Sequence, residues 1–173
     1  MLNYAASYQT ENFYAKSLQL NGLNGTSAQN FVDYWFETAK NNTRVWYFHI
    51  DIHGGKHSSV ATSNIASTSY AHRDKLFLIV FYDREVSGEY PADGFSLMDN
   101  WVAETTRPLE RSDWGMYINY ADTSLNRTTA QDVYFGKNLP RLRDLKAQLD
   151  PEEVFYYPIS LQPVVAEEVT GEI

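Results

Sequence analysis

Residues 45–53 alternate regularly between polar and apolar side chains. Every second position is apolar, which is the period of a β-strand whose two faces meet different surroundings. The apolar face comprises Trp46, Phe48, Ile50 and Ile52, and the opposite face comprises Val45, Tyr47, His49, Asp51 and His53. We therefore predict a strand with one dry face and one face that is free to carry functional side chains.

Three further segments are predicted to be strands. Residues 12–20 mix aromatic and aliphatic side chains with polar ones and stop at Asn21-Gly22, a pair typical of loops. Residues 75–83 form a continuous apolar run of strand length, which indicates a central strand. Residues 114–120 are expected to form a shorter strand.

Apolar residues at helical spacing mark the remaining elements. The predicted helices cover residues 26–41, 93–104 and 129–149. Thr26 followed by Gln29 is a capping-box pattern at the start of the first helix. Pro140 implies a break or a kink in the last one.

Strands and helices in this mixed order predict an α+β fold, with a largely antiparallel sheet and helices packed on one side. We expect the sheet and its helices within residues 1–113, a C-terminal segment at 114–163 and a flexible acidic tail at 164–173. The stretch after Pro158 is expected to be disordered or to rest on a surface outside this chain.

Charge and composition exclude several classes of partner and chemistry. Affinity for nucleic acid and for anionic membranes rests on clusters of Lys and Arg, so the formal net charge of −8 argues against both. The absence of Cys excludes disulfides, thiolate catalysis and Cys-ligated metals from this chain. Aromatic residues make up 15%, which suits an aromatic core and leaves open a sugar-stacking surface or a domain interface.

Three Asn-x-Ser/Thr sequons, at Asn24, Asn41 and Asn126, favour a glycosylated, secreted protein. The first residues have neither the basic nor the apolar region of a signal peptide, so we expect such a signal to lie upstream. No apolar run is long enough to span a membrane.

Three ordered blocks in the last third carry a family resemblance. Residues 117–122, 134–146 and 150–155 resemble the C-terminal signature of berberine-bridge-like FAD-linked oxidoreductases, which are flavoproteins of the vanillyl-alcohol-oxidase type. Upstream, His53-Gly54-Gly55, residues 71–76 and residues 114–117 are similar to the fungal branch that oxidises oligosaccharides, such as glucooligosaccharide and chitooligosaccharide oxidases. The resemblance covers residues 13 to 163.

This resemblance implies an FAD-dependent oxidase that converts a sugar or similar alcohol, with oxygen, into a lactone or carbonyl and hydrogen peroxide. The family's FAD-binding domain lies N-terminal to the matched region, and this chain has no Gly-rich phosphate loop. We therefore expect a substrate-binding portion that holds no FAD alone, is inactive alone and packs against that N-terminal domain. The alternative is a truncated, non-catalytic relative that serves as a carbohydrate-binding or interaction module.

The resemblance also implies the site residues. Tyr120 matches the family's tyrosine that contacts the reacting hydroxyl, and a tyrosine with a pKa of about 10 needs a partner to accept a proton at neutral pH. Asp51 is the candidate partner. Tyr47, His49 and Tyr117 are expected to line the sugar cleft, while Asn119 and Asp122 either orient the flavin edge or fix a turn.

The pattern His49-x-Asp51-x-His53 has a second interpretation. Residues at this spacing share a strand face, and two His with one carboxylate can bind non-haem iron. Such sites usually take their second His from a distant strand, and only His72 is suitable. We therefore predict no metal site.

Overall fold

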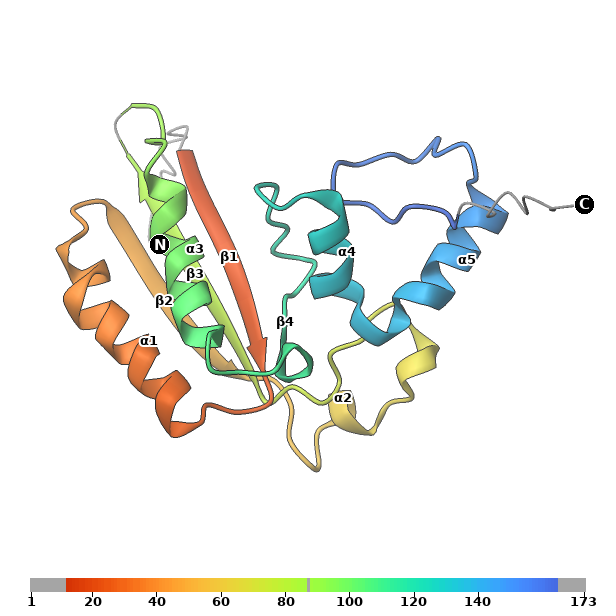
Figure 1. Ribbon diagram of the computed structural model, residues 1–173, viewed down its shortest axis with the longest axis horizontal. Helices are drawn as coiled ribbons and strands as arrows, with labels where there is room; N and C mark the ends of the chain where they lie inside the picture. Colours follow the sequence, from red (N-terminus) through yellow and green to blue (C-terminus); the bar gives the residue numbers. More distant parts are fainter. Residues whose placement is uncertain (1–11, 87, 165–173) are drawn as a thin grey trace, which may run out of the picture.

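The computed structural model describes residues 12–86 and 88–164 (Figure 1). Four antiparallel strands form one sheet in the order β2-β3-β1-β4. The strands are β1 (Asn12–Leu20), β2 (Val45–Ile52), β3 (Phe77–Glu85) and β4 (Trp114–Gly115). β3 pairs with β2 on one side and β1 on the other, so the apolar run forms a central strand, as predicted. The α+β fold with an antiparallel sheet is confirmed.

Two helices, α1 (Gly25–Glu37) and α3 (Gly94–Thr106), cover one face of this sheet (Figure 1). We call it the covered face and the other the open face. Trp101 of α3 is fully buried at the centre of the covered face, where its ring lies between Phe31 of α1 and Phe81 of β3. The side chain of Asn24 begins α1 by accepting a hydrogen bond from the Ser27 amide at 2.8 Å. The predicted capping residue, Thr26, therefore lies inside the helix.

The prediction of a uniformly dry face on β2 is only half right. Trp46 and Phe48 are half-buried against Trp101. Ile50 and Ile52 are 42% and 80% exposed. β2 is an edge strand, and the aromatic core of the covered face reaches only its first half.

β4 is shorter than the predicted strand over residues 114–120. Its pairing with β1 stops at Gly115, because the Met116 amide donates to the carbonyl of Val133 instead. The Tyr120 amide then donates to the Tyr117 carbonyl in a turn. Residues 116–122 therefore leave the sheet and run as a loop past β1.

The predicted long helix is two helices, α4 (Arg127–Phe135) and α5 (Leu139–Leu149). The break lies at Gly136, whose φ of 41° is in the left-handed region that favours glycine. A 3-10 turn at Gly136–Asn138 joins the helices. Pro140 lies in the first turn of α5, where its missing N–H costs no hydrogen bond.

The chain after Pro158 packs back onto α4. Ile159 is buried, and Arg127 of α4 donates to the carbonyls of Ser160 and Leu161 at 2.7 and 2.6 Å. The expectation of disorder here is therefore wrong as far as Val164. Residues 165–173 of the predicted acidic tail lie outside the described residues. Short turns complete the fold, at Ala39–Asn41, Ser59–Thr62 (α2), Ile65–Ser67 and Arg111–Asp113.

Candidate functional site

A row of aromatic rings crosses the open face of the sheet. Phe13 of β1 stacks on Tyr82 of β3 with ring centroids 5.2 Å apart and an interplanar angle of 23°. Tyr82 stacks in turn on Tyr47 of β2 at 4.9 Å and 19°. His49 continues the row, 6.3 Å from Tyr47. We call these four residues the aromatic row. Because stacked neighbours cover the faces of its inner rings, the row presents mainly ring edges and tyrosine hydroxyls to a ligand.

A hollow of about 560 Å³ lies between this row and the loop after Tyr117. Its volume falls in the range of small-molecule sites. Four predicted site residues line this hollow: Tyr47, His49, Asn119 and Tyr120. The other lining residues are Phe13, Tyr14, Ala15, Val80, Tyr82, Ala121 and Thr123. We call it the Tyr120 hollow, and no Lys or Arg lines it.

Tyr120 is held by the backbone around it rather than by its own hydroxyl. Its amide donates to the Tyr117 carbonyl and so closes a turn. The Tyr117 amide in turn donates to the Ser17 hydroxyl of β1 at 2.9 Å. Within the described part of the chain the Tyr120 hydroxyl makes no hydrogen bond, and the residue is 36% exposed. The hydroxyl is therefore available to a bound molecule.

Asp51 lies one step further along β2 than the hollow itself. Its carboxylate is 3.3 Å from Nε2 of His49, which does line the hollow, and its side chain is 59% exposed. No hydrogen bond joins Asp51 to Tyr120 among the described residues. Asp51 thus reaches the Tyr120 hollow through His49.

Tyr117 lies beside the hollow, in a second polar cluster. Its hydroxyl accepts from the Asn119 amide at 2.8 Å, and its ring is 6.1 Å from Tyr70 and 6.3 Å from His53. The Tyr70 hydroxyl accepts from Gln19 and donates to the His72 carbonyl, so Nε2 of His53, 2.5 Å away, must be the donor to Tyr70.

Burial keeps this second cluster neutral. It raises the pKa of Tyr70 to about 12 and lowers the pKa of His53 below its usual value. Both groups are uncharged at neutral pH. This cluster therefore orients the Tyr117 ring and supplies no charge to the hollow.

Asn119 and Asp122 face different surroundings. Asn119 lines the hollow, whereas the Asp122 side chain is fully buried and accepts from the Ser124 amide at 2.9 Å and from Lys16. Burial alone would raise the pKa of Asp122, but the hydrogen bonds from Lys16 and Ser124 outweigh it and lower that pKa. This geometry supports the turn-fixing alternative for Asp122. A flavin contact by either residue stays a prediction.

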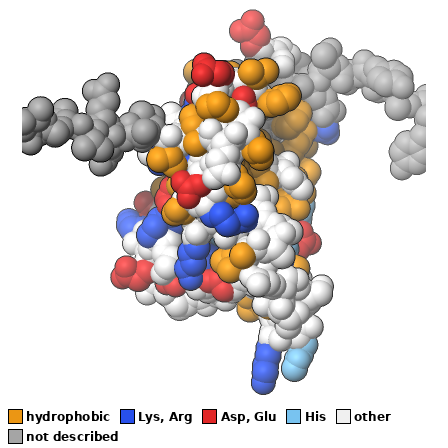
Figure 2. Space-filling view, turned by 90° about the vertical axis from the view of Figure 1, so that its right-hand side faces the viewer, with side chains coloured by type: hydrophobic (Ala, Val, Ile, Leu, Met, Phe, Trp, Pro, Cys, Tyr) orange, Lys and Arg blue, Asp and Glu red, His pale blue; other side chains and the backbone are white. Residues whose placement is uncertain are grey.

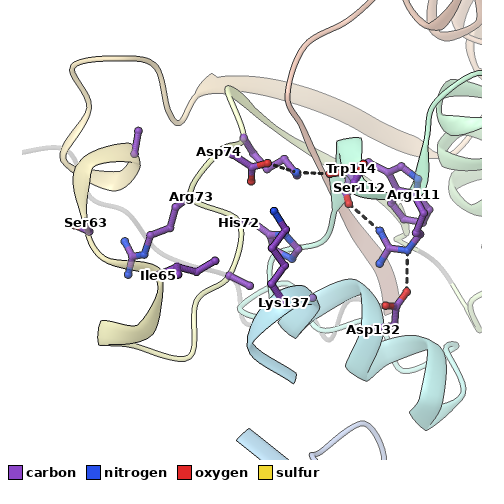
Figure 3. Close-up of a pocket in the computed structure, with 14 residues that line it drawn as sticks. Ser63, Ile65, His72, Arg73, Asp74, Arg111, Ser112, Trp114, Asp132 and Lys137 are labelled. Atoms are coloured by element: carbon purple, nitrogen blue, oxygen red, sulfur yellow. Dashed lines mark hydrogen bonds and ion pairs between the residues drawn. The ribbon is translucent and has the colours of Figure 1, made fainter. Parts of the chain in front are cut away.

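A second, larger hollow of about 610 Å³ lies between the segment before β3 and helix α4. Its charged side chains are mostly paired within the protein: Lys75 binds Asp74 at 3.0 Å and Arg111 binds Asp132 at 2.8 Å. Figure 3 shows the Arg111 guanidinium between Asp132 and Trp114. None of the predicted site residues lines this hollow. We therefore place the candidate site at the Tyr120 hollow.

The structure also bears on the metal, membrane and glycosylation interpretations of the sequence. Among the described residues no group of three His, Cys, Asp or Glu side chains is placed to hold a metal. In the same part of the chain no helix has the length and apolar character needed to cross a membrane. Asn24, Asn41 and Asn126 are all exposed. Asn24 and Asn126 cap helices through Oδ1 and leave Nδ2, the glycosylation atom, unused, while glycosylation itself stays a prediction.

Sequence reasoning missed Phe13, Tyr82 and Tyr70. Tyr82 stands in the continuous apolar run, where no alternation separates the two faces of the strand. Phe13 and Tyr82 meet Tyr47 only through the pairing register, in which Tyr82 is opposite both Ala15 and Tyr47. The unusual density of Tyr was the one signal available.

Comparison with known proteins gives consistent matches. Residues 116–162 match the family described as "Berberine and berberine like". The chain is 48% identical to a carbohydrate oxidase from Microdochium nivale, over 94% of this chain and 33% of that protein. It is 41% identical to a glucooligosaccharide oxidase from Sarocladium strictum, over 94% of this chain and 34% of that protein.

The solved structures agree with these sequence matches. The fold superposes on a xylooligosaccharide oxidase from Myceliophthora thermophila, solved with xylobiose, with a TM-score of 0.87 and 48% identity over 91% of this chain and 34% of that one. The chain spans about a third of the length of the curated relatives it matches. It belongs to the berberine-bridge-like family of FAD-linked oxidoreductases, matching the C-terminal part of fungal carbohydrate and oligosaccharide oxidases.

Proposed function

We propose that this chain is the substrate-binding portion of an FAD-dependent oxidase that converts a sugar or similar alcohol, with oxygen, into a lactone or carbonyl and hydrogen peroxide. The observation that carries the proposal is the Tyr120 hollow, in which an unbonded tyrosine hydroxyl faces the same space as a row of exposed rings. The relatives that match over most of the chain are named as carbohydrate, xylooligosaccharide and glucooligosaccharide oxidases.

The hollow suits the substrate better than it suits a whole FAD molecule. A dinucleotide pyrophosphate needs backbone N–H groups at a helix N-terminus or cationic side chains, and the hollow is lined by neither Lys nor Arg. The flavin would therefore be held by an N-terminal domain outside this chain, and the chain alone would be inactive. Bound there, FAD would supply the acceptor for the hydride that leaves the sugar carbon.

The residues of this chain have distinct parts in the proposal. Tyr120 binds the reacting hydroxyl and accepts its proton while its own phenolic proton passes to His49 across the hollow, because a neutral tyrosine cannot take up a proton without giving one up. Asp51 acts through His49, because the carboxylate stabilises a positive charge on the imidazole that borders the hollow. Tyr47 and Tyr82 contact the sugar through their exposed ring edges and hydroxyls, with Tyr117 beside them.

The test is made in the full-length oxidase with Tyr120→Phe, Asp51→Asn and the double variant. Proton removal in the transition state is typically worth about 10²–10⁴-fold, so the anaerobic rate of flavin reduction at saturating sugar should fall by that order in each single variant. Groups that act as one unit are non-additive, so the double variant should be about as slow as the worse single variant. A near wild-type rate in Tyr120→Phe would remove this residue from the chemistry.

A non-catalytic carbohydrate-binding or interaction module is the second candidate. The aromatic row favours it, because contact between exposed aromatic side chains and sugars needs no flavin. Spectra and calorimetry of the isolated chain separate the two functions. A module would bind oligosaccharides alone and would have no FAD domain in its precursor, whereas the oxidase portion should carry no flavin absorbance and should need the rest of the protein for turnover.

The N-terminal domain is also the partner that we propose for an apolar surface at the far end of the molecule. After α5, Val154 and Phe155 are 78% and 80% exposed, beside Leu149 and Tyr156. Figure 2 shows apolar side chains gathered at this end. Exposed patches of this kind usually mark an interface.

We also propose that the protein is secreted and glycosylated, because the three sequon asparagines are exposed.

A further inference from the structure

We propose that Lys16 is a positioning residue, which fixes the loop carrying Tyr120 by holding Asp122 inside the protein. The proposal rests on the function proposed for Tyr120. Lys16 lies on β1, more than a hundred residues before the loop, and its side chain is buried on the covered face of the sheet, whereas the Tyr120 hollow opens on the other face. The contacts of Lys16 and of its neighbour Ser17 carry the proposal.

The Lys16 amine is buried and fully bonded. Its side chain is 5% exposed, and Nζ binds Asp122, Asp99 of α3 at 2.7 Å and the Tyr14 hydroxyl at 3.3 Å. An ammonium has three N–H donors, and all three are used here. Removing the amine would leave the Asp122 carboxylate buried without its cation, which is a strongly unfavourable state.

Asp122 in turn shapes the end of the loop. Its other carboxylate oxygen accepts from the Ser124 amide at 2.9 Å and from the Ser124 hydroxyl at 2.6 Å. Its own amide donates to the Tyr134 hydroxyl of α4 at 2.8 Å. The position of Asp122 is therefore fixed by β1, by α4 and by Ser124 of its own loop, and Tyr120 is only two residues away.

The beginning of the loop is tied to the neighbouring residue of the same strand. Ser17 accepts from the Tyr117 amide at 2.9 Å. Successive residues of a strand point to opposite faces, so Lys16 holds one end of the loop from the covered face and Ser17 holds the other from the open face. Tyr120 lies between these two anchors with no bond from its hydroxyl. Its placement thus depends on the anchors.

A second buried ion pair in the same domain provides a matched control. Asp83 is fully buried and binds Arg44 at 2.7 Å, with Tyr90 and Asn42 as further partners. It joins β3 to the start of β2, and none of these four side chains belongs to the loop or lines the hollow. Arg44→Met should therefore perturb a buried carboxylate as Lys16→Met does, without moving Tyr120.

The experiment uses the full-length oxidase with Lys16→Met, Arg44→Met and each of these combined with Tyr120→Phe. Because a misplacement of about 1 Å costs about 10²-fold, Lys16→Met should slow anaerobic flavin reduction at saturating sugar by about 10–100-fold, with little change in the dissociation constant of the sugar. Adding Tyr120→Phe should slow it little further. Arg44→Met should keep the rate, and its combination with Tyr120→Phe should match Tyr120→Phe alone.

A direct readout of the ring separates this proposal from the proposed function. With 3-fluorotyrosine introduced at position 120, the ¹⁹F resonance should shift and broaden in Lys16→Met and stay unchanged in Arg44→Met. If Tyr120→Phe retains full activity, the proposed chemistry fails and the resonance alone decides the positioning proposal. If Lys16→Met does not fold, Ser124→Ala replaces it, because that change removes one hydrogen bond to Asp122 and keeps the ion pair. An unchanged resonance, or equal rate losses in Lys16→Met and Arg44→Met, would overturn the proposal.

Discussion

The two faces of this sheet carry similar side chains in opposite arrangements. On the covered face, Phe48 meets Phe31 and Trp35 edge to face, at interplanar angles of 89° and 86°. On the open face, Tyr82 lies nearly parallel to Phe13 and Tyr47, at 23° and 19°. Edge-to-face rings fill a volume from all sides, whereas a stacked row covers its own ring faces and leaves ring edges exposed. Ring geometry, rather than aromatic content, distinguishes the core from the candidate site.

Polar groups divide between the two faces in the same way. On the covered face the buried charges of Lys16 and Asp83 are matched by partners on neighbouring elements. Buried polar groups require this, because an unmet bond there costs free energy. Among the described residues, the Tyr120 hydroxyl on the open side is unbonded and Asp51 has His49 as its one partner. One face therefore determines stability, and the other is available to ligands.

The sharpest test of this difference is the removal of one large ring from each face. Trp101 is fully buried, contacts five aromatic rings and donates its indole N–H to the Phe31 carbonyl at 3.2 Å. Trp101→Ala should lower the free energy of unfolding by about 3–5 kcal/mol. Tyr82→Ala should cost about 1 kcal/mol, the value of its stacked contacts. Urea unfolding followed by circular dichroism measures both, and equal losses would refute the division.

The fold could be predicted from the sequence where the side-chain pattern of one segment determines its secondary structure. Residues 12–20 form a strand as expected, and the apolar run predicted at 75–83 forms a strand two residues later, at Phe77–Glu85. The prediction was wrong where partners distant in the sequence decide the outcome. Residues 116–120 have strand-like side chains, but the Met116 amide donates a hydrogen bond to the Val133 carbonyl of α4 instead of to a neighbouring strand. Ile50 and Ile52 have the right period, yet no helix reaches them.

The candidate site was predictable only in part, for a related reason. Tyr47 and His49 share a face by strand periodicity, and the structure adds Tyr120 from a loop that the family resemblance had indicated. Lys16 escaped notice because its sequence position suggests an ordinary strand lysine. Its importance comes from a carboxylate more than a hundred residues away along the chain, which no local pattern can show.

Ionisable groups provide a second test, with an intermediate effect. Burial lowers the pKa of His72 to about 4 from its usual value near 6.5, although the bond to the Val133 carbonyl opposes this. Between these two pKa values the unfolded chain binds a proton at His72 that the folded protein does not bind. The free energy of unfolding is therefore unaffected by this group above about pH 6.5 and falls by about 3 kcal/mol in total as the pH decreases to about 4.

The measurement compares unfolding free energies between pH 4 and pH 7. His72→Gln should be less stable than the wild type at pH 7 and should have a flatter pH dependence. A curve as steep in His72→Gln as in the wild type would contradict the assignment of this pH dependence to His72.

The smallest expected effect concerns the aromatic row and the ligand rather than stability. If the row holds sugar rings in the complete oxidase, Tyr82→Ala removes an interaction that is equally strong in the ground state and the transition state. Such a loss raises KM and leaves kcat nearly unchanged. With a stacking contribution of about 0.5–1.5 kcal/mol, KM for an oligosaccharide should rise by about 2–12-fold. Tyr82→Phe keeps the stacked ring between Phe13 and Tyr47 and should raise KM less than Tyr82→Ala does. A fall in kcat at constant KM in Tyr82→Ala would instead give the open face a part in the chemical step, because an interaction lost only in the transition state appears in kcat.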